Sequence, residues 1–125
     1  MENWIDDFRF LSLFLFKSIT RNFYFMNIIS QHIDQIVNLC QKNEVNSLFA
    51  FGSVTTNEFT NESDIDLVVD IEDNDPVRYT EKYYNLKFRL EEILNRKIDL
   101  LEMKAIRNRF LKNEIDRTKI QVYGA

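Results

Sequence analysis

The sequence predicts an α/β domain of the α+β kind, in which helices flank a small mixed β-sheet. Segments with helical spacing of apolar residues alternate with short β-branched runs, in the order helix, strand, strand, helix, strand, helix, strand. The chain has 125 residues, one proline and no serine- or glycine-rich linker, which indicates one main folding unit. Its content of 45% hydrophobic and 29% charged residues is typical of a globular protein.

The first 25 residues differ in composition from the rest of the chain. They hold six of the eleven phenylalanines and the only tryptophan. They do not resemble a signal peptide, because Glu2 and Asp6 stand where a basic segment would be, and the apolar run at 10–16 is too short to cross a bilayer. We therefore expect an aromatic-rich N-terminal extension over residues 1–25, acting in packing or in oligomer formation, and a domain over residues 26–125.

The spacing of apolar residues predicts three helices after this extension. The first covers residues 27–42, where apolar side chains recur every three or four positions. The second begins at Asp75-Pro76, because aspartate can cap a helix and proline is tolerated at its first position, and it continues to about Arg96. The third is a short helix over residues 106–116.

Four short runs predict strands. Residues 45–51 (VNSLFAF) form an apolar run that Gly52 ends, and residues 64–71 carry apolar, β-branched side chains on alternating faces. Residues 97–101 (KIDLL) and residues 120–123 complete the set. This order, with no internal repeat, favours a mixed sheet covered by helices.

Charge and cysteine content exclude several classes of function. A formal charge of −4 and a pI near 5.0 argue against broad affinity for nucleic acid, so a nucleic-acid partner would need a local basic patch. The single Cys40 cannot form an intramolecular disulfide, and no Cys/His cluster with zinc spacing surrounds His32. We expect a cytoplasmic protein with no membrane association and no direct nucleic-acid contact.

Two aspartates begin the second predicted strand. Strand alternation would place Asp64 and Asp66 on one face, about 6.6 Å apart at their Cα atoms, with Ile65 and Leu67 on the other. Two carboxylates this close repel each other unless a cation lies between them. Because hard oxygen ligands suit Mg²⁺ or Mn²⁺, the pair predicts a metal site.

Asp99, in KIDLL, is a third carboxylate. If its strand lies beside that of Asp64, it joins the same face and can act as a metal ligand or as the base for an attacking hydroxyl. Gly52 and Ser53 end the preceding strand in a turn whose backbone N–H groups can approach an anion without a Cβ in the way. The turn thus predicts a phosphate-binding position.

The joint spacing of these residues is more specific than any one of them. Asp-x-Asp pairs and Gly-Ser turns are each common, but Gly-Ser, ten residues and then Asp-x-Asp, placed at strand ends, form a distinctive combination. An EF-hand is excluded, because DIDLVVD is rich in strand formers and has no glycine at the sixth position. A P-loop is excluded as well, because no Gly-Lys-Ser/Thr occurs.

FGS, SDIDLVV and KIDLL, with the closing AIRNRFLKNEIDRTKIQVYG, resemble the minimal nucleotidyltransferase (MNT) family of the polymerase-β-like superfamily. The resemblance covers about residues 27–124 and implies a polymerase-β-like nucleotidyltransferase fold in the domain over residues 26–125. It implies ATP as the donor and two Mg²⁺ or Mn²⁺ ions held by three carboxylates, with the triphosphate on the glycine-serine turn. The residues concerned are Asp64, Asp66 and Asp99 for the metals and catalysis, and Gly52 and Ser53 for the nucleotide.

The usual setting of that family is a toxin–antitoxin pair with a HEPN-domain ribonuclease. The resemblance therefore implies an antitoxin that transfers AMP from ATP to a hydroxyl of the toxin, most simply a tyrosine. Two alternatives stay open at this point: an antitoxin that neutralises the toxin by binding alone, and a nucleotidyltransferase that acts on a small molecule. The loop near Thr56 bears on the first, because it carries no Lys or Arg where many relatives carry a basic residue.

Overall fold

The computed structural model describes residues 25–55, 60 and 62–124. The predicted N-terminal extension lies outside these residues except for Phe25, which is helical and fully buried in the main core. The boundary and the role of the extension stay predictions. In the described part of the chain, no helix has the length and apolar character needed to cross a membrane.

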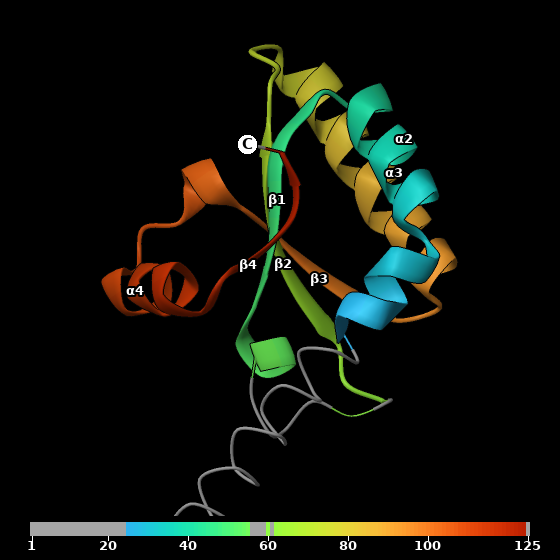
Figure 1. Cartoon of the computed structure of the whole chain (residues 1–125). Helices are drawn as coiled ribbons and strands as arrows, with labels where there is room; N and C mark the ends of the chain where they lie inside the picture. Colours follow the sequence, from blue (N-terminus) through green and yellow to red (C-terminus); the bar gives the residue numbers. More distant parts are fainter. Residues whose placement is uncertain (1–24, 56–59, 61, 125) are drawn as a thin grey trace, which may run out of the picture.

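The strands form one mixed sheet in the order β3-β2-β1-β4 (Figure 1). Strand β1 runs antiparallel to both β2 and β4, whereas β2 runs parallel to β3, which confirms the predicted mixed sheet. The elements are α2 (Ile33–Lys42), β1 (Val45–Phe51), β2 (Ile65–Ile71), α3 (Pro76–Leu94), β3 (Ile98–Glu102), α4 (Arg109–Thr118) and β4 (Ile120–Gly124), with 3₁₀ turns η1 (Gly52–Thr55) and η2 (Met103–Ala105).

Helices α2 and α3 lie side by side on one face of the sheet, and α4 lies on the other (Figure 1). The main core fills the space between the sheet and the α2–α3 pair. Many of its buried members come from the two helices and from β1, β2 and β3, among them Ile36, Leu48, Ile65, Leu67, Leu86, Leu90 and Ile98. Alternation along β2 therefore turns the residues between these positions toward α4.

A smaller apolar cluster joins the second face of the sheet to α4. Phe51, Val68 and Ile115 form its buried centre. Because Asp66 and Asp70 each lie two positions from Val68 on β2, both side chains belong to this face as well. The α4 face of the sheet is thus partly apolar and partly acidic.

Two predicted helices differ from the structure, one by an interruption and one by its start. The helix predicted over residues 27–42 is interrupted at His32, whose backbone leaves the helical region and whose N–H donates to Ile29 O at 3.1 Å, three residues back. The helix predicted to begin at residue 106 begins instead at Arg109. Asn108 sets this start, since its side-chain oxygen accepts hydrogen bonds from the backbone N–H groups of Phe110 and Leu111.

The start of α3 combines a cap with a group of ion pairs. Asp75 caps the helix before Pro76, as predicted. Just upstream, the nearly buried Asp73 carboxylate accepts hydrogen bonds from the Arg78 guanidinium at 3.2 Å and from Lys82 Nζ at 2.6 Å. These two cations, with the Asp75 backbone N–H, hold the pKa of Asp73 well below its ordinary value.

This depressed pKa predicts a loss of stability in acid. As the pH falls, Asp73 is protonated in the unfolded chain near its ordinary pKa of about 3.9, and in the folded protein only at a lower pH. The stability that the ionised Asp73 contributes is therefore complete above a pH of about 3.9 and is lost as the pH falls toward the folded-state pKa. Asp73→Asn is expected to lower the free energy of unfolding at neutral pH and to flatten its decline below pH about 4. Urea unfolding at several pH values measures this. Asp34→Asn, at an exposed site in α2, should leave the decline unchanged, and an equally steep decline in Asp73→Asn would contradict the prediction.

Candidate active site

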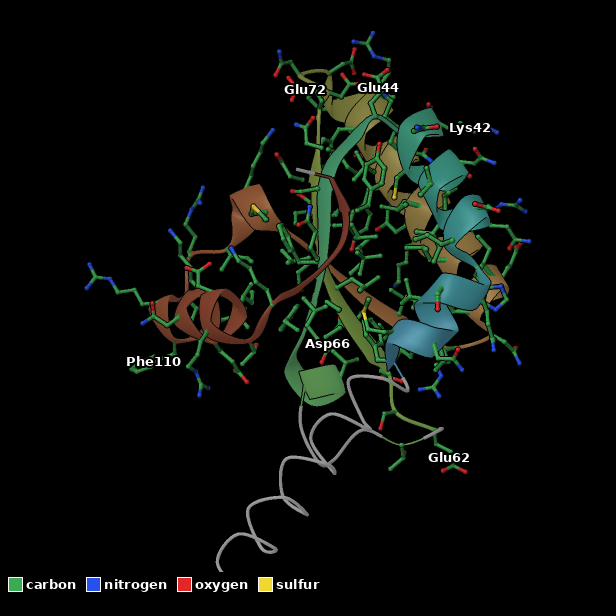
Figure 2. The ribbon with its side chains drawn as sticks, viewed as in Figure 1. Lys42, Glu44, Glu62, Asp66, Glu72 and Phe110 are labelled. Atoms are coloured by element: carbon green, nitrogen blue, oxygen red, sulfur yellow. The ribbon has the colours of Figure 1, made fainter. Side chains whose placement is uncertain are left out.

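The parallel pairing of β2 with β3 places two of the predicted carboxylates next to each other. Asp66 is the register partner of Asp99, and on its other side Asp66 lies opposite Phe51 of β1. Register partners in neighbouring strands project to the same face, so both carboxylates lie on the α4 face of the sheet. Asp66 is half-buried and Asp99 is exposed. Figure 2 shows Asp66 at the end of the sheet beside η1.

Gly52 makes the close approach on which this arrangement depends. Its φ of +72° lies in the left-handed region, which favours glycine. A Cβ built on Gly52 would lie 2.7 Å from Asp66 Oδ2, closer than real Cβ atoms come to another atom. The missing side chain therefore makes room for the Asp66 carboxylate and brings the backbone of η1, in which Ser53 follows, next to it.

Asp64 lies one residue before β2 and is exposed. Arg96, just before β3, holds the segment that precedes Asp64: its Nη1 donates hydrogen bonds to Thr60 O at 3.0 Å and to Ser63 O at 3.2 Å. At the strand start, the Ile65 N–H donates to Lys97 O at 3.1 Å. No local sequence pattern predicts this role of Arg96, which directly follows Asn95, the residue that ends α3.

The donor chemistry of these residues fits a hard divalent cation. Carboxylate oxygens are the ligands that Mg²⁺ and Mn²⁺ prefer, and the space that Gly52 leaves lets backbone and carboxylate share one small region. Among the residues that the structure describes, no group of three or more His, Cys, Asp or Glu side chains is close enough to hold a metal ion. Asp66 and Asp99 thus stand together as a pair, and the convergence of Asp64 with them stays a prediction.

Covalent catalysis by the thiol does not fit this structure. Cys40 is buried in the core between the sheet and the α2–α3 pair, on the face opposite to that of the two paired aspartates. Burial raises the pKa of the Cys40 thiol to about 12, so the reactive thiolate does not form at neutral pH. The Cys40 thiol therefore takes no part in the chemistry at this end of the sheet.

Comparison with known proteins identifies the family. Residues 34–125, most of the chain, match the family described as polymerase beta, nucleotidyltransferase. The chain belongs to this nucleotidyltransferase family. The match includes the glycine-serine turn, the strand that Asp66 occupies and the strand of Asp99.

Similar sequences are found in Methanocaldococcus jannaschii. A protein of Methanocaldococcus jannaschii named as a candidate protein adenylyltransferase, MJ1379, is 39% identical over 84 residues, which cover 67% of this chain and 83% of that protein. A second such protein from the same organism, MJ0128, is 34% identical over the same shares of the two chains.

Solved structures share the fold. A minimal nucleotidyltransferase superimposes with a TM-score of 0.59 at 24% identity, covering 73% of this chain and 89% of that one. A chain of a toxin–antitoxin complex with AMP-PNP gives a TM-score of 0.57 at 22% identity over 74% and 73% of the two chains. A chain of the complex between an MNT antitoxin and a tri-AMPylated HEPN toxin of Shewanella oneidensis gives 0.54 at 21% identity over 78% and 73%. These likenesses confirm the predicted polymerase-β-like fold.

Proposed function

We propose that this nucleotidyltransferase transfers AMP from ATP to a tyrosine hydroxyl of a HEPN-type ribonuclease toxin and thereby acts as an antitoxin. The observation that carries the proposal is the register pairing of Asp66 with Asp99 beside Gly52, in a chain whose relatives are named as candidate protein adenylyltransferases. The fold shared with a chain of the complex between an MNT antitoxin and a HEPN toxin supports the choice of partner.

The reaction needs positioning and neutralisation of charge more than covalent chemistry. The acceptor oxygen attacks the α-phosphorus of ATP, a new P–O bond forms, the bond to the β-phosphate oxygen breaks, and pyrophosphate leaves. Two Mg²⁺ or Mn²⁺ ions, held by the Asp66–Asp99 pair and by Asp64 once its carboxylate converges on that pair, would supply the charge that offsets the triphosphate. The backbone of Gly52 and Ser53 would hold the leaving phosphates.

The position of Asp99 suits a macromolecular acceptor. Strand β3 is an edge of the described sheet and the Asp99 side chain is exposed, so a hydroxyl on another protein can reach it from solvent. Asp99 then accepts the hydroxyl proton as the new P–O bond forms. Asp66 is instead half-buried on an inner strand, between β1 and β3, and is less accessible to the acceptor.

A transfer assay separates this proposal from an antitoxin that only binds. The chain is incubated with a purified HEPN-type ribonuclease, Mg²⁺ and ATP labelled at the α-phosphate. We expect label on a toxin tyrosine, located by mass spectrometry, and loss of that label when the metal is chelated or when Asp64→Asn and Asp66→Asn are combined. The matched control combines Asp34→Asn with Glu81→Gln, which removes the same charge at exposed positions of α2 and α3.

Neutralisation of the toxin without AMP transfer would overturn the proposal. If the Asp64→Asn/Asp66→Asn variant protects cells from the toxin as well as the wild-type chain does, and the toxin gains no AMP, neutralisation occurs by binding alone. Label on an added aminoglycoside or another small hydroxyl compound, with none on the toxin, would favour a small-molecule acceptor.

A further inference from the structure

A cavity of about 330 Å³ lies between η2 and α4, on the same face of the sheet as Asp66 and Asp99. Its floor is apolar: Val68 of β2 and Ile115 of α4 are buried there, and Ile106 adds a third aliphatic side chain. Its rim is basic, with four cationic side chains and one carboxylate. The rim residues are Lys104, Arg107, Lys112, Lys119 and Asp116. We refer to this cavity as the basic pocket.

The positive charge of the basic pocket is only partly neutralised by the chain itself. Lys104 Nζ lies 3.3 Å from Asp70 Oδ1, and Lys119 Nζ lies 3.6 Å from Asp116 Oδ1. In the part of the chain that the structure describes, Arg107 and Lys112 form no ion pair, and Arg107 Nη1 donates to the Lys104 backbone carbonyl at 3.0 Å. A protein of net charge −4 thus presents two exposed cations beside an apolar floor.

The floor of the basic pocket lies on the same face of the sheet as the candidate active site. Val68 follows Asp66 by two residues on β2, so the two side chains share a face and their Cα atoms are about 6.6 Å apart. The register partner of Val68 is Leu101, which likewise follows Asp99 by two residues. Figure 1 shows η2 and α4 on the same side of the sheet. A ligand that fills the basic pocket can therefore extend toward the two aspartates.

We infer that the basic pocket docks an acidic segment of the protein acceptor during AMP transfer, an inference that rests on the proposed function. One acceptor carboxylate would face Arg107 and Lys112, and an apolar neighbour would cover Val68 and Ile115. Because an extended chain advances about 3.3 Å per residue, the carboxylate lies roughly two to four residues from the modified hydroxyl.

Two other ligand classes fit the basic pocket less well. A nucleotide triphosphate is held best by backbone N–H groups at a glycine turn, and that turn is at Gly52, outside the basic pocket. A nucleic acid requires an extended basic surface and aromatic stacking partners, whereas the lining of the basic pocket has no aromatic residue. An acidic and apolar peptide uses both the cationic rim and the aliphatic floor.

A peptide-binding experiment tests the inference apart from catalysis. The probes are two short fluorescein-labelled peptides that share a tyrosine and a leucine and differ only in carrying glutamates or lysines at neighbouring positions. Fluorescence anisotropy gives their Kd for the wild-type chain, for Arg107→Glu/Lys112→Glu, and for Lys42→Glu/Arg89→Glu. The last variant changes charge by the same amount at the groove between α2 and α3, on the opposite face of the sheet.

The expected result is a charge-dependent preference located in the basic pocket. The wild-type chain should bind the glutamate peptide about tenfold more tightly than the lysine peptide, and Arg107→Glu/Lys112→Glu should abolish or reverse this preference. Lys42→Glu/Arg89→Glu should keep it. Raising the ionic strength should weaken the preference in the wild-type chain.

Three results would overturn the inference. These are equal binding of the two peptides, an equal loss in both double variants, and tighter binding of a single-stranded RNA oligonucleotide that Arg107→Glu/Lys112→Glu abolishes. A binding preference with no transfer of label to any tyrosine would count against the proposed AMP transfer and leave the docking site standing. If label is transferred at the same rate whatever the peptide charge and in both double variants, the proposed AMP transfer stands and the docking site does not.

Discussion

Replacing Asp66 by asparagine is expected to lower the rate of AMP transfer by about a hundredfold to a thousandfold while the protein stays folded. Asparagine keeps the size of the side chain but removes the negative charge at the point where β2, β3 and Gly52 meet. The measurement is the initial rate of incorporation of labelled AMP into the acceptor, with urea unfolding as the check on the fold.

Asp70 provides the matched control for this substitution. It lies on the same strand and the same face as Asp66, but its carboxylate is held by Lys104 and by Asn46, at 3.3 Å in each case. We expect Asp70→Asn to change the transfer rate by less than about threefold, because a partly exposed ion pair contributes little. Equal losses in Asp66→Asn and Asp70→Asn would show that Asp66 acts through the general charge of the sheet face and not at the site.

The strands that carry the two aspartates were predictable because their sequences satisfy strand chemistry locally. Residues 64–71 carry apolar side chains at every second position, and residues 97–101 are mostly apolar around Asp99. Strand β2 begins one residue later than the predicted range, and β3 is shifted by one residue at both ends. Alternation also predicted a shared face for Asp64 and Asp66, which stays a prediction because Asp64 lies one residue before β2. It could not give the register of β2 against β3, since that pairing depends on how α3 crosses the sheet.

Replacing Gly52 by alanine is expected to have the second large effect. The left-handed φ of +72° would cost roughly 1–2 kcal/mol in the free energy of unfolding for a residue with a Cβ. The new Cβ would also meet Asp66 Oδ2 at 2.7 Å, so the carboxylate must move. A misplacement of about 1 Å at a catalytic group can lower a rate about a hundredfold. We therefore expect Gly52→Ala to lower the rate of AMP transfer per folded molecule by about a hundredfold.

The only other glycine of the chain separates these two effects. Gly124, in β4, also has a positive φ, +100°, and a Cβ there would collide with the Asn46 backbone. Gly124→Ala should therefore lower the free energy of unfolding without changing the transfer rate per folded molecule. Urea unfolding and active-fraction titration are carried out on both variants. An equal loss of rate per folded molecule in both would mean that the effect of Gly52→Ala is global.

The features that the sequence did not reveal are those made by contacts distant in the chain. Arg96 reaches carbonyl groups of Thr60 and Ser63, and no local pattern links these positions. The basic residues of the basic pocket are scattered through the last third of the sequence, where they resemble solvated charges of a helix. They become one surface only because η2 and α4 both lie beside Val68.

The parallel pairing of β2 with β3 also determines when the site can exist during folding. Strands β1 and β2 are antiparallel neighbours in sequence and in the sheet, so Gly52 and Asp66 can meet through a comparatively local contact. Asp99 joins them only after α3 has crossed the sheet, and closing that longer loop costs more chain entropy. Domains with a larger share of such non-local contacts fold more slowly. The pairing of Asp66 with Asp99 therefore depends on the complete crossing of α3, whereas the contact of Gly52 with Asp66 depends on neighbouring strands alone.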